Sequence, residues 1–159
     1  MTGLLFLAGL AGVIFILYQS QASAMTTGLP ASEIPTELPA PTIDIVPRFA
    51  QAIARAEGFY VSGSRPQRNH NPGDMTQDLI GKGIGRDGPF VVYANDQDGW
   101  SNLYAQIQLW LSGQSAFAGP DSTISDLSRF YTTTDQSAWA ANVAASLGVS
   151  PNTPISAVA

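Results

Sequence analysis

Apolar and polar positions along the chain divide it into three parts. Residues 3–18 are an uninterrupted apolar run, GLLFLAGLAGVIFILY. Residues 26–47 contain five prolines among Thr, Ser, Ala and Glu, a composition that favours extended, semi-rigid conformations. Beyond this stretch, apolar residues recur at three- to four-residue spacing, which is typical of amphipathic helices. We therefore expect an N-terminal segment over residues 1–24, a linker over 25–46 and one folded domain over 47–159.

The apolar run has two interpretations. It is slightly shorter than the ~20 residues that cross a typical bilayer, which is compatible with a retained single-pass anchor. Ala22-Ser23-Ala24 matches the small-x-small pattern of a signal-peptidase site, although no basic residue precedes the run. The pattern favours the anchor over a cleaved export signal. Without flanking basic residues, the orientation in a membrane stays open.

Hydrophobic spacing in the folded domain predicts four helices and a short β element. The helix starts and stops follow from capping residues and from glycines that end helical patterns. We expect a mainly α domain with a small β insert, an α+β fold. The predicted elements are a helix over 47–57, a β element or hairpin over 90–93, a helix from an Asp96 N-cap to Gly113, a helix from the capping box Thr123-x-x-Asp126, and a helix from Asp135 to Gly148.

Glu57 is the most informative residue of the domain. Phe49, Ile53 and Glu57 follow one another at four-residue intervals, so a carboxyl group lies on the apolar side of the last helical turn. Burial and the negative end of the helix both disfavour its charge. A carboxyl group kept neutral near neutral pH is what a general acid requires. The competing interpretation is an ordinary solvated glutamate at a helix end.

A polar loop follows at residues 68–74, with the sequence RNHNPGD. Its amides both donate and accept hydrogen bonds, which suits sugar hydroxyls and acetamido groups. An ordinary surface turn is the alternative. His70 is the single histidine and the chain has no cysteine, so the sequence indicates no metal site, no disulfide and no cofactor.

Composition and charge narrow the class of partner. Charged residues make up 12% of the 159 residues, and the formal net charge is −5. Lysines and arginines form no run, so the sequence shows no nucleic-acid footprint. Neutral partners such as glycans fit this composition better than polyanions.

Three segments together resemble a lysozyme-like domain of phage and bacterial proteins, related to lytic transglycosylases and goose-type lysozymes. The family pattern is a helix ending in Glu-Gly, an Arg-Asn-x-Asn-Pro-Gly-Asn loop and a Gly-Trp at the start of the next helix. Here these positions hold Glu57-Gly58, the loop 68–74 and Gly99-Trp100. The match covers residues 48–158. Asp74 departs from it by replacing the usual Asn, and it would either hold a hydrolytic water or raise the pKa of Glu57.

The resemblance implies that Glu57 is the general acid that protonates a glycosidic oxygen of peptidoglycan. It implies that Tyr131 contacts Glu57 or the sugar, although packing in the core is an equal alternative. Helical spacing, rather than the resemblance, predicts that Trp100 is part of the core and that Trp110 is exposed. No second carboxylate is as well placed, which favours a lytic transglycosylase over a hydrolytic lysozyme or muramidase. The substrate-binding candidates are Arg68, Asn69, Asn71, Asp74 and Tyr131.

The expected protein is therefore a peptidoglycan-cleaving glycosidase of a phage virion or a bacterial envelope. Its partners would be glycan strands and, through the N-terminal helix, a virion membrane or the bacterial inner membrane facing the periplasm. The alternative is a non-catalytic peptidoglycan-binding or structural protein that keeps the fold. The oligomeric state is left open.

Overall fold

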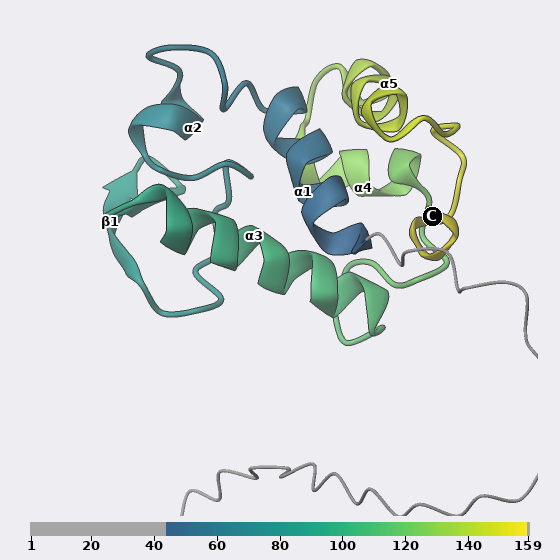
Figure 1. The fold of residues 1–159 in the computed structure, drawn as a ribbon, viewed down its shortest axis with the longest axis horizontal. Helices are drawn as coiled ribbons and strands as arrows, with labels where there is room; N and C mark the ends of the chain where they lie inside the picture. Colours follow the sequence, from purple (N-terminus) through teal and green to yellow (C-terminus); the bar gives the residue numbers. More distant parts are fainter. Residues whose placement is uncertain (1–43, 159) are drawn as a thin grey trace, which may run out of the picture. The chain divides into compact units, whose positions relative to one another are not determined.

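The computed structural model describes residues 44–158, and these form five α-helices, a two-stranded sheet and a short 3-10 helix (Figure 1). The expected mainly α domain with a small β insert is confirmed. The predicted N-terminal segment and nearly all of the linker lie outside the described residues. The elements are α1 (Ile45–Ala56), α2 (Arg65–Arg68), β1 (Gly83–Asp87), β2 (Phe90–Tyr93), α3 (Asp96–Leu111), α4 (Ile124–Tyr131), α5 (Gln136–Leu147) and η1 (Ile155–Ala157).

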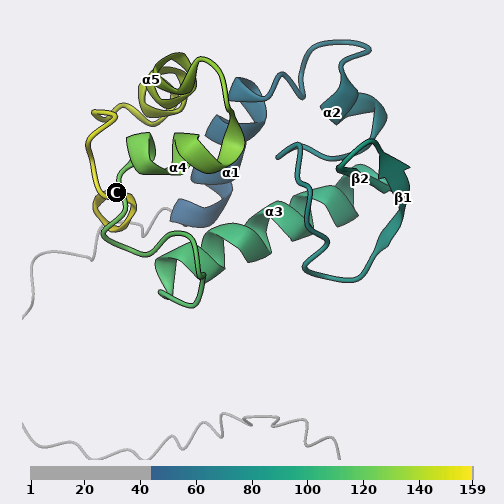
Figure 2. The same ribbon diagram turned by 180° about the vertical axis from the view of Figure 1, so that it is seen from behind.

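Helix α1 is the centre of the packing. It contacts α3 on one side and α5 on another, and α4 packs against α5 (Figures 1 and 2). Phe49 and Ile53 of α1 are both fully buried, as their four-residue spacing predicts. They meet Leu103 and Ile107 of α3 and Val143 of α5 in one apolar core. The hairpin and α2 lie together near the N-terminal end of α3.

The capping residues were predicted with one error. Helix α3 is capped by Asn95, whose Oδ1 accepts a hydrogen bond from the Asp98 N–H at 3.0 Å, and the prediction of an Asp96 cap is wrong. Asn95 has the extended backbone of an N-cap, whereas Asp96 is already helical. The carboxylate of Asp96 instead adds negative charge to the first turn, where the helix dipole favours it.

The two later helices begin where the sequence places them, by different means. The capping box of α4 is confirmed: Thr123 Oγ1 accepts from the Asp126 N–H at 3.1 Å, and Asp126 Oδ2 accepts from the Thr123 N–H at 3.0 Å. Asp135 precedes α5 but makes no side-chain cap, and its φ of 52° places it in the left-handed region. Gly148 ends α5 in the same region, as expected of a C-terminal glycine.

The small sheet is an antiparallel hairpin, which confirms the predicted β element at residues 90–93. Gly85 pairs with Val92 and Asp87 pairs with Phe90, with an irregularity between Gly83 and Gly85. Val91 faces the interior and is fully buried. Among residues 44–158, no helix has the length and apolar character needed to cross a membrane. The apolar run at 3–18 lies outside this part of the chain.

Candidate active site

Glu57 is positioned by the end of α1. Its N–H donates to the Ile53 carbonyl at 2.9 Å, and its side chain is half-buried. Gly58 follows with a φ of +80°, a conformation that glycine adopts without strain and that ends the helix. The carboxyl therefore extends the apolar side of α1 beyond Phe49 and Ile53, as the spacing predicts.

Trp139 of α5 makes the one hydrogen bond to the Glu57 carboxyl within the described residues. Its Nε1–H donates to Oε1 at 2.6 Å. Tyr131 of α4 stacks on the Trp139 indole, with ring centroids 4.7 Å apart and an interplanar angle of 20°. The Tyr131 hydroxyl donates to Met75 Sδ at 3.6 Å, so the hydrogen bond considered between Tyr131 and Glu57 is absent.

The environment of Glu57 favours its neutral form. The pKa of Glu57 is raised from 4.5 to about 7, mainly because the carboxyl is buried. The Trp139 hydrogen bond and the charge of Arg65 lower this pKa, and the negative charge of Asp74 raises it. Removal of water from around a carboxyl is the main cause, because the anion loses more solvation than the acid. At neutral pH a large share of Glu57 carries a proton.

Asp74 is engaged by Arg65, a residue that the sequence interpretation did not select. Arg65 Nε donates to Asp74 Oδ1 at 3.1 Å, and Nη2 contacts Oδ2. The guanidinium carbon lies 3.5 Å from the centroid of the Phe90 ring, so the cation is also held by a cation–π contact. The Asp74 side chain is only 6% exposed. Asp74 is thus close enough to affect Glu57 electrostatically while both of its oxygens are bound to Arg65.

The other polar residues of the loop mostly make hydrogen bonds that fix the conformation of the loop. Asn71 is fully buried: its Nδ2 donates to the carbonyls of Met75 and Val91 at 2.9 Å each, and its Oδ1 accepts from the Met75 N–H at 2.9 Å. Asn69 Nδ2 donates to Asp87 Oδ2 at 3.2 Å, and Arg68 donates to the Gly63 carbonyl. The Asn71–Val91 and Asn69–Asp87 bonds tie the loop to the hairpin, and the sugar contacts of Arg68 and Asn69 stay predictions.

The Gly99-Trp100 pair has a steric explanation. A Cβ atom on Gly99 would lie 1.8 Å from the His70 carbonyl oxygen, so only glycine lets the loop backbone meet the first turn of α3. On the same side, His70 Nδ1 lies 2.6 Å from Asp96 Oδ1. The Trp100 ring meets the Phe59 ring edge-on at 5.5 Å and is packed against the core, as expected.

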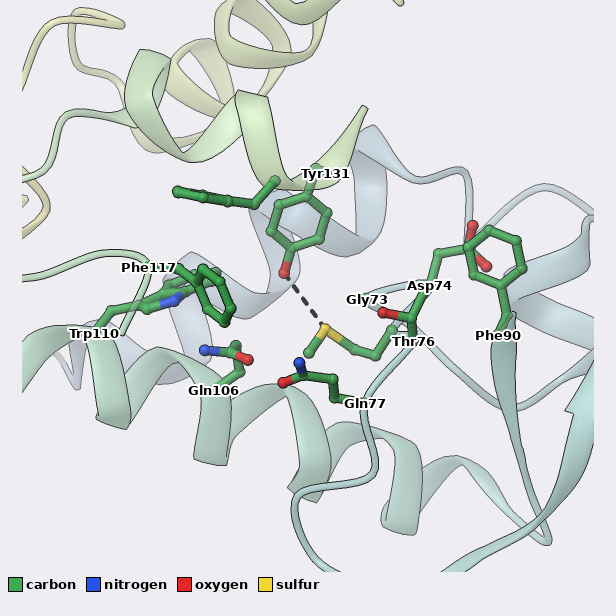
Figure 3. Close-up of a pocket in the computed structure, with 11 residues that line it drawn as sticks. Gly73, Asp74, Thr76, Gln77, Phe90, Gln106, Trp110, Phe117 and Tyr131 are labelled. Atoms are coloured by element: carbon green, nitrogen blue, oxygen red, sulfur yellow. Dashed lines mark hydrogen bonds between the residues drawn. The ribbon is translucent and has the colours of Figure 1, made fainter. Parts of the chain in front are cut away.

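A pocket of about 230 Å³ lies beside Asp74 and Tyr131 (Figure 3). Glu57 does not line it, but Asp74 and Tyr131 do, and both interact electrostatically with Glu57. The lining residues are Gly73, Asp74, Met75, Thr76, Gln77, Phe90, Gln106, Trp110, Phe117, Phe130 and Tyr131.

The pocket combines exposed aromatic rings with unengaged amides. Phe117 and Phe130 are 62% and 51% exposed, and their ring centroids are 5.7 Å apart. The side-chain amides of Gln77 and Gln106 point into the pocket and make no hydrogen bond within the described part of the chain (Figure 3). Trp110 is buried, so the expectation that it is exposed is wrong: Phe49 and Tyr131 pack edge-on against its ring.

Two further findings bear on the class of site. Over residues 44–158, no group of three or more His, Cys, Asp or Glu side chains is arranged to hold a metal ion. Comparison of the chain with protein-family models, curated proteins and solved structures finds no match in any of the three. The site combines a carboxyl with a raised pKa, a second carboxyl bound to arginine, and an open pocket of rings and amides.

Proposed function

We propose that this protein cleaves peptidoglycan glycan strands as a lytic transglycosylase, with Glu57 as the general acid. The observation that carries the proposal is a half-buried carboxyl with a pKa raised to about 7 that is bonded to Trp139, whose stacking partner Tyr131 lines an open pocket. An acid of that pKa is still protonated at neutral pH yet transfers its proton readily. The predicted anchor at 3–18 would tether the enzyme to a virion or envelope membrane.

The proposed reaction uses one carboxyl twice. Glu57 gives its proton to the glycosidic oxygen while the bond from that oxygen to the anomeric carbon breaks. A hydroxyl of the same sugar then attacks the anomeric carbon and returns its proton to the Glu57 carboxylate. The products are an anhydro sugar end and a strand with a new hydroxyl end, and no water is consumed.

The Arg65–Asp74 pair supports transfer over hydrolysis. Both common hydrolytic routes need a second carboxylate, either as a nucleophile or as the base that activates a water. Asp74 is the acidic residue whose charge acts on Glu57, but Arg65 binds both of its oxygens and little of it is exposed. A carboxylate held in this way is poorly placed to bind a water or to attack a sugar.

The pocket supports a glycan as the substrate. Its volume of about 230 Å³ is below the 300–1,000 Å³ of sites for drug-sized ligands, and suits one sugar unit with its acetamido group. The rings of Phe117 and Phe130 offer an apolar surface for a sugar face, and the amides of Gln77 and Gln106 offer hydrogen bonds. The one charged residue lining it, Asp74, is paired with Arg65. The resemblance of the Glu-Gly helix, the polar loop and the Gly-Trp turn to lysozyme-like domains points in the same direction.

The test is the release of muropeptides from purified sacculi by the full chain and by Glu57→Gln. The variant should lose at least about 100-fold in rate, the usual contribution of a general acid, while Asp121→Asn, which removes a surface carboxyl, should act like the wild type. Equal release by Glu57→Gln and wild type would overturn the catalytic assignment. Mass spectrometry separates anhydro from reducing ends, and mainly reducing ends would contradict the transglycosylase mechanism.

A further inference from the structure

We propose that Trp139 is a positioning residue that directs the acidic proton of Glu57 to the carboxyl oxygen Oε2. The inference rests on the proposed function, since it concerns how the proton of the general acid is presented. It starts from the 2.6 Å hydrogen bond between the indole Nε1–H and Oε1 of Glu57, which joins residues 82 positions apart in the chain.

The chemistry of the donor decides which oxygen carries the proton. An indole N–H only donates, so the oxygen that it contacts must accept. In a neutral carboxyl group the carbonyl oxygen is the better acceptor, and the other oxygen is the hydroxyl. With Oε1 engaged by Trp139, the hydroxyl is therefore Oε2.

Oε2 is free to deliver that proton. It takes part in no hydrogen bond with the described residues. Among residues 44–158, the Tyr93 hydroxyl is the one side-chain polar atom that is fully buried and has no hydrogen-bond partner. Oε2 has no partner either, so it must be accessible to solvent. The carboxyl thus has one oxygen fixed against the protein and one open oxygen, which is the arrangement that a directed proton donor needs.

Packing holds the indole in this orientation. Trp139 is only 7% exposed and stacks face to face on Tyr131, whose hydroxyl is in turn bound to Met75 Sδ. Its helix, α5, packs against α1, the helix that ends at Glu57. Tyr131 packs against one face of the indole and α1 packs against its helix. The indole therefore cannot turn its N–H away from Oε1 without disturbing the core.

A neutral donor also preserves the acid. An arginine or lysine at the same place would favour the carboxylate through its full charge, whereas the indole orients the group with a weaker effect on its pKa. The pKa of Glu57 accordingly stays near 7 despite the bond. The other groups that act electrostatically with Glu57 are Asp74 and Arg65, together with the hydroxyl of Tyr131.

The first test compares Trp139→Phe with Trp100→Phe in the full chain. Both remove an indole N–H from a packed ring, but only Trp139 contacts Glu57. Trp139→Phe should lower kcat for muropeptide release at least about tenfold. It should also move the basic limb of the pH profile to higher pH, because the lost hydrogen bond lowers the Glu57 pKa in the wild type. Trp100→Phe should move neither. A Trp139→Phe enzyme with wild-type kcat and pH profile would overturn the proposal.

A second measurement does not depend on turnover or on a stable Trp139→Phe variant. In the wild type, the indole ¹H–¹⁵N resonance of Trp139 should titrate with an apparent pKa near that of Glu57, about 7. The Trp100 resonance should stay flat, and Glu57→Gln should abolish the Trp139 titration. If the resonance titrates but sacculi are not cleaved, the proposed function fails while the Trp139–Glu57 geometry stands. If sacculi are cleaved but the resonance does not titrate, the inference fails alone.

Discussion

Replacing Glu57 by glutamine is expected to stabilise the folded protein at neutral pH while it removes activity. In the unfolded chain the carboxyl ionises with a pKa of 4.5, whereas in the folded protein its pKa is about 7. Between these values the folded state binds more protons than the unfolded state, so the free energy of unfolding falls as the pH rises. Glutamine has the same shape, keeps an oxygen that accepts from Trp139, and does not ionise.

The size of the effect follows from the two pKa values. The interval from 4.5 to about 7, at 1.36 kcal/mol per pKa unit, corresponds to about 3 kcal/mol in the wild type above pH 7. Glu57→Gln should therefore match the wild type near pH 4 and exceed its unfolding free energy by about 3 kcal/mol near pH 8, with most of the change between roughly pH 5 and 7.

Urea denaturation of both proteins at several pH values measures this difference directly. Other titrating groups are common to the two proteins and cancel in the comparison. Asp121→Asn is the control, because it removes a carboxyl at the surface and should leave the stability nearly unchanged. A Glu57→Gln difference that is the same near pH 4 and near pH 8 would refute the reasoning, since Glu57 would then not have a raised pKa.

Three further changes test the loop and its carboxyl. Asn71→Ala should lower the unfolding free energy by roughly 2–4 kcal/mol in urea denaturation, because it leaves buried backbone groups of the loop unpaired; wild-type stability would contradict the buried network. Gly99→Ala should destabilise the fold by at least about 1–3 kcal/mol and lower activity, because its Cβ would overlap the His70 carbonyl; a variant with the wild-type melting temperature would refute the close approach. Asp74→Asn should retain muropeptide release, and the basic limb of its pH profile should move to lower pH because the charge of Asp74 raises the Glu57 pKa; complete loss of release would indicate a hydrolytic role for Asp74.

Helix periodicity predicted much of the fold because each long helix buries one face. The buried face of Phe49 and Ile53, the capped start of α4 and the glycine end of α5 follow from local spacing and capping. Helix α2 was missed because four residues are too few for a periodic pattern. Ser64-x-x-Gln67 was nonetheless a usable signal: the Ser64 hydroxyl caps the Gln67 N–H, as in a capping box.

The partners of Glu57 were harder to predict than its position on the apolar side of α1. Glu57 is conspicuous because a charge on an apolar face is a local anomaly. Trp139 fits the apolar spacing of its helix, so the sequence does not mark it as unusual. Periodicity predicts that its ring is buried, but not which group its N–H binds. Its bond to Glu57 depends on how α5 docks on α1, which is tertiary packing. Trp110 was misjudged for the same reason, since a helix angle does not show that Tyr131 of another helix covers the ring.

The two carboxyls of the site differ in the kind of donor that each receives. Asp74 faces a guanidinium, which binds both of its oxygens and carries a full positive charge. Glu57 faces an indole, which binds one oxygen and carries none. A cation stabilises the anion of its partner, whereas a neutral donor in a buried setting leaves the acid form accessible near neutral pH. Exchanging these donors would remove the asymmetry, because a cation beside Glu57 would favour its ionised form. The proposed role of Glu57 as an acid thus depends less on its own position in α1 than on its donors: Trp139 of α5 binds Glu57, whereas Arg65 of α2 binds Asp74.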